Sequence, residues 1–223
     1  MFFSVSLLFE IIAFSLCIYY YVNKRDRLTR AFVPFLGLTV FVEFLGWWWS
    51  FNSGTEYKFP MFNLFIPIEV VFYSFLFRWY LRSPKLKALV YYLIFFFIGF
   101  SLVNMVFIQG FRSTFDSYTA LLGSFFIVIF CCFYFYQSIL PEQIDQQLLK
   151  QPFFWVASGL LIFYLGSVIA NALFEYLRSN DLQEQSRRIY AIIFDSLNVF
   201  LYSSFCIAFY LCPNDKKTYS SPS

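Results

Sequence analysis

The chain has 223 residues, of which 60% are hydrophobic, 26% are aromatic and only 13% are charged, and its formal net charge is +3. A water-soluble globule of this length could not bury so much apolar surface, and soluble domains carry about a quarter charged residues. A disordered chain is excluded on the same grounds, and the weak positive charge excludes a nucleic-acid binder. A membrane protein with several spans remains, and the lipid bilayer is its first predicted partner.

Seven apolar segments follow one another along the chain. Each is long enough for a helix to cross a hydrocarbon core of about 30 Å. The strands of a β-barrel would be about half as long and would alternate in polarity, which these segments do not. The sequence therefore predicts an all-α fold, a polytopic membrane bundle of seven transmembrane helices. They span residues 2–22, 31–51, 61–81, 87–108, 117–140, 152–176 and 189–211, and a short tail follows at 212–223.

Lys and Arg residues are unevenly divided between the two ends of these segments. Eleven of the 16 fall on one side: Lys24, Arg25, Arg27, Arg30, Arg78, Arg82, Lys85, Lys87, Lys150, Lys216 and Lys217. The other side receives Lys58, Arg112, Arg178, Arg187 and Arg188. Because cytoplasmic loops carry the excess of basic residues, the N-terminus is predicted outside and the C-terminus in the cytoplasm. The basic inner loops are a predicted contact for a cytoplasmic partner protein.

Four acidic residues lie inside the apolar segments, namely Glu10, Glu43, Glu69 and Asp195. Counted from the outer end of its own segment, each lies six to eight residues deep, roughly 9–12 Å at the rise of a helix. Four acids at one depth on four helices predict a polar layer that faces a shared interior. Further polar residues recur at helical spacing, with Asn171 in the sixth segment and Asn198 in the seventh, and Ser101 and Asn104 add a small polar face to the fourth.

The third segment contains the most distinctive local motif, Asn63-Leu-Phe-Ile-Pro67-Ile-Glu69. Proline has no N–H, so Pro67 leaves the carbonyl of Asn63 without its helical hydrogen bond and predicts a kink. An oxygen-rich kink of this kind often lines a cavity in membrane proteins, although simple packing is the alternative. Asn63-x-Phe65 recurs as Asn198-x-Phe200, which leaves open a 3 + 1 + 3 repeat of the helices.

Buried acids have three interpretations. An ionised carboxylate at a helix centre costs about 2.5–3.5 kcal/mol even on the lenient insertion scale, and no Lys or Arg lies in the same predicted layer. The acids could be neutral and hold helices together through hydrogen bonds. They could surround an ion or a cationic ligand, or they could relay protons.

Histidine is absent, which argues against an enzyme because many intramembrane hydrolases use it as metal ligand or general base. The five cysteines show no C-x-x-C spacing, so no metal site and no cofactor are predicted, and no catalytic residue is assigned.

In topology the chain resembles the microbial rhodopsins, but residues 189–211 lack the lysine that holds retinal in that family. The 3 + 1 + 3 arrangement also looks like that of SWEET-type sugar transporters, although the seventh segment lacks their proline. Asn63-Leu-Phe with Glu69, and Phe154-Trp155 with Gly159-Leu160-Leu161, resemble small seven-helix proteins of the bacterial inner membrane found in sensory settings. That resemblance implies a sensor-like role and an inner (plasma) membrane location.

These observations predict an integral membrane receptor-like or signalling subunit with an outward-facing polar pocket. The alternative is a transporter of a small solute or cation, coupled to protons. A second alternative is a structural or pore-forming subunit that acts as a homo-oligomer.

Overall fold

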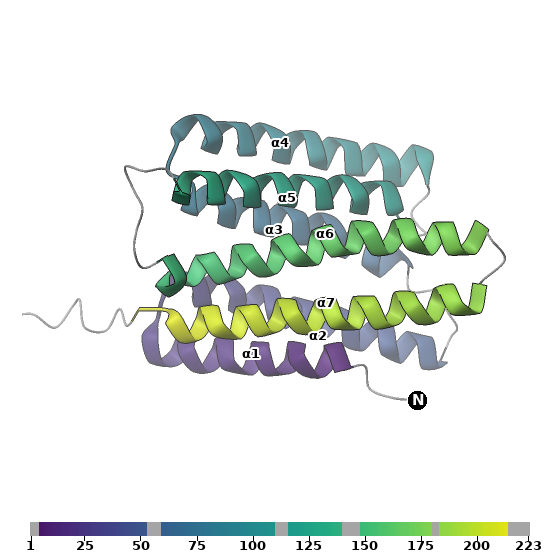
Figure 1. Ribbon diagram of the computed structural model, residues 1–223, viewed down its shortest axis with the longest axis horizontal. Coiled ribbons are helices and arrows are strands. Elements are labelled where there is room, and N and C mark those ends of the chain that lie inside the picture. Colours follow the sequence, from purple (N-terminus) through teal and green to yellow (C-terminus); the bar gives the residue numbers. More distant parts are fainter. Residues whose placement is uncertain (1–4, 53–58, 110–115, 140–147, 180–182, 214–223) are drawn as a thin grey trace, which may run out of the picture. The chain divides into compact units, whose positions relative to one another are not determined.

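The computed structural model describes residues 5–52, 59–109, 116–139, 148–179 and 183–213. Within these ranges it contains helices and no strand (Figure 1). The long helices are α1 (Val5–Lys24), α2 (Arg27–Asn52), α3 (Phe59–Tyr80), α4 (Pro84–Val103), α5 (Ser117–Ile139), α6 (Pro152–Ser179) and α7 (Gln183–Leu211). A π-helix, η2 (Asn104–Ile108), continues α4, and a 3-10 turn, η4 (Leu148–Lys150), precedes α6.

All seven long helices are long and apolar enough to cross a membrane. The prediction of an all-α chain with seven membrane-length helices is therefore confirmed for the described residues. The orientation of the termini stays a prediction, and the tail from residue 214 onward lies outside the described residues.

Local side-chain chemistry sets the helix ends. α2 begins before the apolar run at residue 31, because Asp26 caps it: its Oδ2 accepts a hydrogen bond from the backbone N–H of Leu28 at 2.8 Å. Just before it, Arg25 has a φ of 57°, the left-handed conformation that turns the chain between α1 and α2. α4 begins at Pro84, since the missing N–H of proline costs nothing in the first turn of a helix.

The chain divides into two compact units, which we describe separately. The terminal unit comprises residues 1–40 and 145–223, so it contains α1, the first part of α2, α6 and α7. The central unit comprises residues 41–144, and contains the end of α2 together with α3, α4 and α5.

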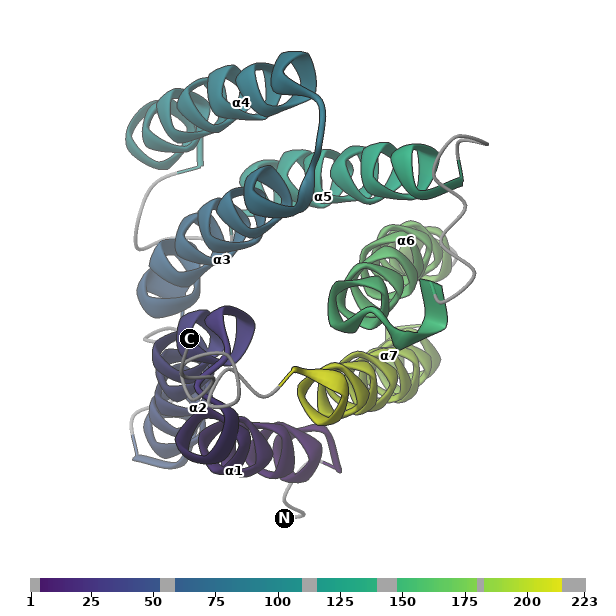
Figure 2. The ribbon, with the colours of Figure 1, turned by 90° about the vertical axis from the view of Figure 1, so that its left-hand side faces the viewer.

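In the terminal unit, α7 packs along α6 and along α1. Figures 1 and 2 show α6 and α7 side by side over most of their length. Two glycines of α6 permit this close approach: a Cβ on Gly159 would lie 2.8 Å from the Cβ of Ser204, and one on Gly166 would lie 2.5 Å from Leu197 Cδ2. On α2, the buried Phe32 ring contacts Phe205 and Phe209 of α7 with centroids 5.0 and 5.3 Å apart.

Lys24, the last residue of α1, binds the C-terminal end of α7. Its Nζ donates hydrogen bonds to the carbonyl oxygens of Tyr210 at 2.5 Å and Cys212 at 2.8 Å, where the helix leaves carbonyls without intrahelical partners. The ammonium also lies 4.7 Å from the ring centroid of Tyr20 and 5.7 Å from that of Tyr210. Burial, with the negative charge of the Asp26 carboxylate nearby, raises the pKa of the Cys212 thiol, which is therefore neutral near pH 7.

In the central unit, α3, α4 and α5 pack against one another, as Figure 2 shows. Gly123 of α5 lies at their meeting point, since a Cβ there would lie 2.5 Å from Val70 on α3 and 3.3 Å from Phe97 on α4. Phe97 contacts Phe126, which in turn contacts Phe130, and the three rings are buried. This aromatic core fixes the spacing of the three helices that carry the candidate site.

We expect Gly159→Ala to destabilise the terminal unit by about 1–3 kcal/mol, because the new methyl group meets a Cβ of α7 that cannot rotate away. Gly99→Ala is the matched control, since a Cβ on Gly99 has no atom of the described residues within 4 Å. Thermal unfolding of the purified variants in detergent measures the difference. Equal melting temperatures for the two variants would contradict the close approach of α6 and α7.

Lys24→Met is expected to destabilise the protein by about 1–3 kcal/mol, because the carbonyls of Tyr210 and Cys212 lose a charged donor. Arg27→Met removes an equally basic but exposed side chain of the next helix and should change stability little. Chemical denaturation followed by tyrosine and tryptophan fluorescence compares them. A loss as large in Arg27→Met would point to general charge rather than to the contact of Lys24 with α7.

Candidate functional site

The four predicted intramembrane acids are divided equally between the two units. Glu10 on α1 is buried and Asp195 on α7 is partly exposed, and both belong to the terminal unit. Glu43 on α2 is exposed and Glu69 on α3 is partly exposed, and both belong to the central unit. Convergence of all four in one pocket therefore stays a prediction.

Within the terminal unit, Glu10 and Asp195 lie at matching levels. α1 and α7 run in the same direction, because Lys24 at the end of α1 meets Tyr210 and Cys212 at the end of α7. Counting back from that contact places Glu10 and Asp195 each about 21–23 Å along its own helix. Two of the four acids thus occupy one depth on neighbouring helices.

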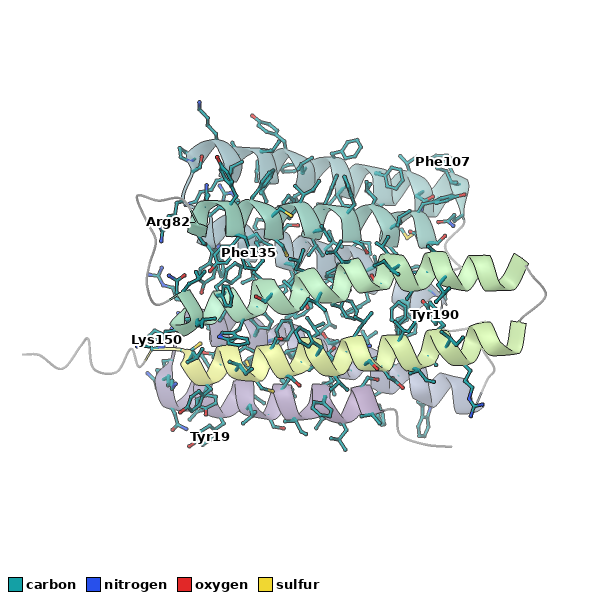
Figure 3. The ribbon with its side chains drawn as sticks, in the orientation of Figure 1. Tyr19, Arg82, Phe107, Phe135, Lys150 and Tyr190 are labelled. Atoms are coloured by element: carbon teal, nitrogen blue, oxygen red, sulfur yellow. The ribbon has the colours of Figure 1, made fainter. Side chains whose placement is uncertain are left out.

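The two predicted asparagines of α6 and α7 each donate to a carbonyl one turn earlier in their own helix, and Asn171 also accepts a hydrogen bond from α7. The Nδ2 of Asn171 donates to the carbonyl of Ser167 at 2.8 Å, and its Oδ1 accepts a hydrogen bond from Tyr190 of α7 at 3.1 Å. The Nδ2 of Asn198 donates to the carbonyl of Phe194 at 3.0 Å. Tyr190, labelled in Figure 3, therefore links α7 to α6 through Asn171.

Pro67 lies inside α3, which continues as one helix from Phe59 to Tyr80. Asn63, four residues earlier, is fully buried, and its side-chain Oδ1 accepts a hydrogen bond from the backbone N–H of Asp116 at 2.9 Å. The asparagine of the predicted oxygen-rich motif thus binds the start of α5, 53 residues further along the chain.

Asn63 belongs to a largely buried group of side chains, at the ends of the three packed helices of the central unit, which we call the polar cluster; Gln109 is its partly exposed member. Its other members come from the end of α4 and the start of α5: Asn104, Gln109, Asp116 and Thr119. Asn63, Asn104 and Thr119 are 0% exposed and Asp116 is 1% exposed. The cluster lies at the same end of the central unit as Phe107, opposite to Arg82 (Figure 3).

Asn104 is at the centre of the polar cluster. Its Nδ2 donates to Gln109 Oε1 at 3.0 Å, to Thr119 Oγ1 at 3.1 Å and to Asp116 Oδ1. An amide nitrogen carries only two hydrogens, so three oxygen acceptors compete for them. The cluster is therefore richer in acceptors than in donors.

Two helix ends bring these side chains together. Asn104 begins the π-helix, in which the N–H of Gln109 donates to the Asn104 carbonyl at 2.9 Å, five residues back. Asp116 precedes α5 and caps it, because its Oδ1 accepts from the N–H of Thr119 at 3.3 Å and its carbonyl accepts from the N–H of Ala120 at 3.1 Å. Gln109 also binds the first turn of α5, donating to Ser117 Oγ at 2.9 Å.

Two oxygens of the polar cluster, Asn104 Oδ1 and Asp116 Oδ2, are buried without a hydrogen-bond partner in the part of the chain that the structure describes. Leaving such an atom unpaired costs about 1–3 kcal/mol, and more for a charged group. Among the described residues, no basic side chain pairs with Asp116. The arrangement is therefore an electron-rich site that a positively charged group would complete.

Sequence reasoning identified Asn63 as a site residue, and Asn104 only as part of a polar face. Asp116 directly precedes the predicted segment 117–140, and an aspartate in that position is a helix-cap signature. The approach of Asn104 to Asp116 depends on the packing of α4 against α5, which no local pattern reveals.

Comparison with protein-family models, with curated proteins and with solved structures gave no match for this chain. The resemblance to small seven-helix inner-membrane proteins therefore stays a prediction.

Asn63→Leu is expected to lower stability by about 1–3 kcal/mol, because the buried N–H of Asp116 loses its acceptor. Leu64→Ala, at the exposed neighbouring position, is the control and should cost much less. Hydrogen exchange at the start of α5 measures the local effect, and thermal unfolding measures the global one. Unchanged protection at residues 116–120 would contradict the role of Asn63 in anchoring α5.

Proposed function

We propose that the protein is an integral membrane receptor-like or signalling protein, without enzymatic activity, whose ligand binds in the polar cluster of the central unit. One observation carries the proposal: Asn104 and Asp116 are buried, and each retains an oxygen without a hydrogen-bond partner among the residues that the structure describes. By the positive-inside prediction, this end of α3, α4 and α5 faces the exterior, as expected for a receptor pocket.

A purely structural role, in which hydrogen bonds hold neighbouring helices together, is the competing explanation for buried polar side chains. Side chains that serve only to hold helices together are selected for mutual satisfaction, because an unpaired polar atom cancels the gain from its neighbours. The Asn63–Asp116 bond fits that role, since donor and acceptor match. Asn104 Oδ1 and Asp116 Oδ2 do not fit that role, because no donor among the described residues binds either oxygen. These two acceptors without donors favour a ligand site.

The π-helix provides a segment that can respond to a ligand. It closes its turns with hydrogen bonds five residues apart, and such segments occur frequently at functional sites. Conversion to α-helical bonding would shift the register by one residue, about 1.5 Å and 100°. Because Asn104 is both the first residue of this segment and the centre of the cluster, a ligand there would bias its geometry.

α4 connects the polar cluster to a basic region at its other end. There the Arg78 guanidinium lies 5.4 Å from the ring centroid of Tyr91, and the backbone N–H of Arg82 donates to Gln137 at 2.9 Å. Lys85 and Lys87 follow in the first turns of α4, and no acidic residue occurs between Glu69 and Asp116. A shift of α4 would move these charges, which are the proposed contact for a cytoplasmic partner.

Hydrogen exchange on the full-length protein in liposomes tests the receptor role. A bound ligand should change protection at residues 104–109 and at residues 82–87 together, and Asp116→Asn should abolish both changes. Asp26→Asn is the matched control, because it makes the same substitution at another helix cap and asparagine still caps.

The same liposomes separate the receptor from a cation or proton-coupled transporter. A receptor leaves them tight to ions under an imposed gradient, whereas flux that is lost in Asp116→Asn would replace the receptor proposal with a transporter. In the hydrogen-exchange experiment, a change in protection confined to residues 104–109 would contradict signalling through α4.

A further inference from the structure

The Asn104 amide nitrogen lies among oxygens of the kind that bind a cation. Three oxygens of different residues surround it, Gln109 Oε1 at 3.0 Å, Thr119 Oγ1 at 3.1 Å and Asp116 Oδ1. The nitrogen offers two polar hydrogens to these three acceptors. On the same amide group, Oδ1 has no partner in the described part of the chain.

The charge of the cluster also calls for a cation. Asp116 is 1% exposed, and among the described residues its side chain meets only the amide of Asn104 and the N–H of Thr119. A buried carboxylate is normally paired with a basic group or bound to a metal ion, because its desolvation is costly. The nearest basic residues of α3 and α4, Arg78 and Lys87, are at the opposite ends of those helices.

We infer that the polar cluster binds one small monovalent metal cation, of the size of Na⁺, through side-chain oxygens of Asp116, Asn104, Thr119 and Gln109. Rotation of the Asn104 amide about its terminal torsion exchanges nitrogen for oxygen, and that torsion has two nearly equivalent positions. The rotation points Oδ1 at the ion, so this oxygen acquires a positively charged partner beside the Asp116 carboxylate. The inference rests on the proposed function, because it names the ligand of the same site.

The charge of the polar cluster and its burial determine which kind of ion it can bind. One carboxylate and one monovalent cation give a neutral buried site, whereas a divalent ion would leave a net positive charge that no further acidic side chain of the described cluster balances. Calcium sites of this size usually contain several carboxylates, and magnesium retains several bound waters, for which side chains as buried as Asn104, Asp116 and Thr119 leave little room. An organic cation would require a cavity far larger than a cage in which the oxygens lie about 3 Å from one nitrogen.

Thermal unfolding of the full-length protein in detergent tests the inference. It is measured in NaCl, KCl or choline chloride at equal ionic strength, so that charge screening is constant. NaCl should raise the melting temperature in a manner that follows the logarithm of its concentration, because only the folded state binds the ion. Asp116→Asn should lose this response, and Asp26→Asn should retain it. Thr119→Ser keeps the hydroxyl and should bind normally, whereas Thr119→Val should bind at least about tenfold more weakly.

Direct binding of radioactive sodium is a second measurement that does not depend on thermal unfolding. It can therefore also be applied to a variant of low stability. Equal melting in the three salts with no sodium bound would overturn the inference, as would a sodium response that survives in Asp116→Asn. A stronger response to calcium than to sodium would overturn the monovalent assignment.

Two results distinguish the ion site from the receptor role. Sodium binding that depends on Asp116 but leaves residues 82–87 unchanged in hydrogen exchange upholds the ion site and contradicts the receptor. Linked exchange changes with another ligand, without sodium binding, uphold the receptor and contradict the ion site.

Discussion

Hydrocarbon provides no hydrogen bonds, and this constraint governs the rest of the structure. Every backbone N–H and C=O inside the bilayer must be satisfied by the chain itself, which leaves helices as the simplest solution for segments of this length. Among the described residues, the long apolar segments are all helical. Serine side chains within them follow the same rule, since Ser74, Ser124 and Ser204 each return their hydroxyl to a carbonyl one turn earlier. The polar cluster departs from this rule, because Asn104 Oδ1 and Asp116 Oδ2 are buried without a hydrogen-bond partner among the described residues.

Lipid tails also remove the usual driving force for packing, since they are as apolar as leucine. Close backbone approach and complementary shape must then hold helices together. Gly159 and Gly166 serve this purpose between α6 and α7, and Gly123 does so where α3, α4 and α5 meet. The large aromatic side chains fill the space around these contacts, as Phe32 does against Phe205 and Phe209. Small and large residues therefore have complementary roles in each unit.

The helices were predictable from the sequence because membrane thickness imposes a minimum length on each apolar segment. Their ends were less predictable, because caps such as Asp26 and Pro84 act through hydrogen bonds and backbone geometry rather than hydropathy. Of the polar cluster, Asn63 was accessible through its spacing to Pro67. Asp116 and Asn104 were not, since they are 12 residues apart and meet only because α4 and α5 pack together. The four predicted acids share a depth by residue counting, but counting along helices carries no information on which helices are neighbours.

The contact of Lys24 with the end of α7 has a consequence for biosynthesis. α1 emerges from the ribosome before the central unit, whereas Tyr210 and Cys212, which Lys24 binds, are synthesised after it. The central unit is one continuous stretch, residues 41–144, so its helices can associate while translation continues. The terminal unit is assembled from the two segments that flank the central unit, so α1 can pack against α7 only after the central unit has been synthesised. A truncation before α7 would thus leave the first helix without its main neighbour.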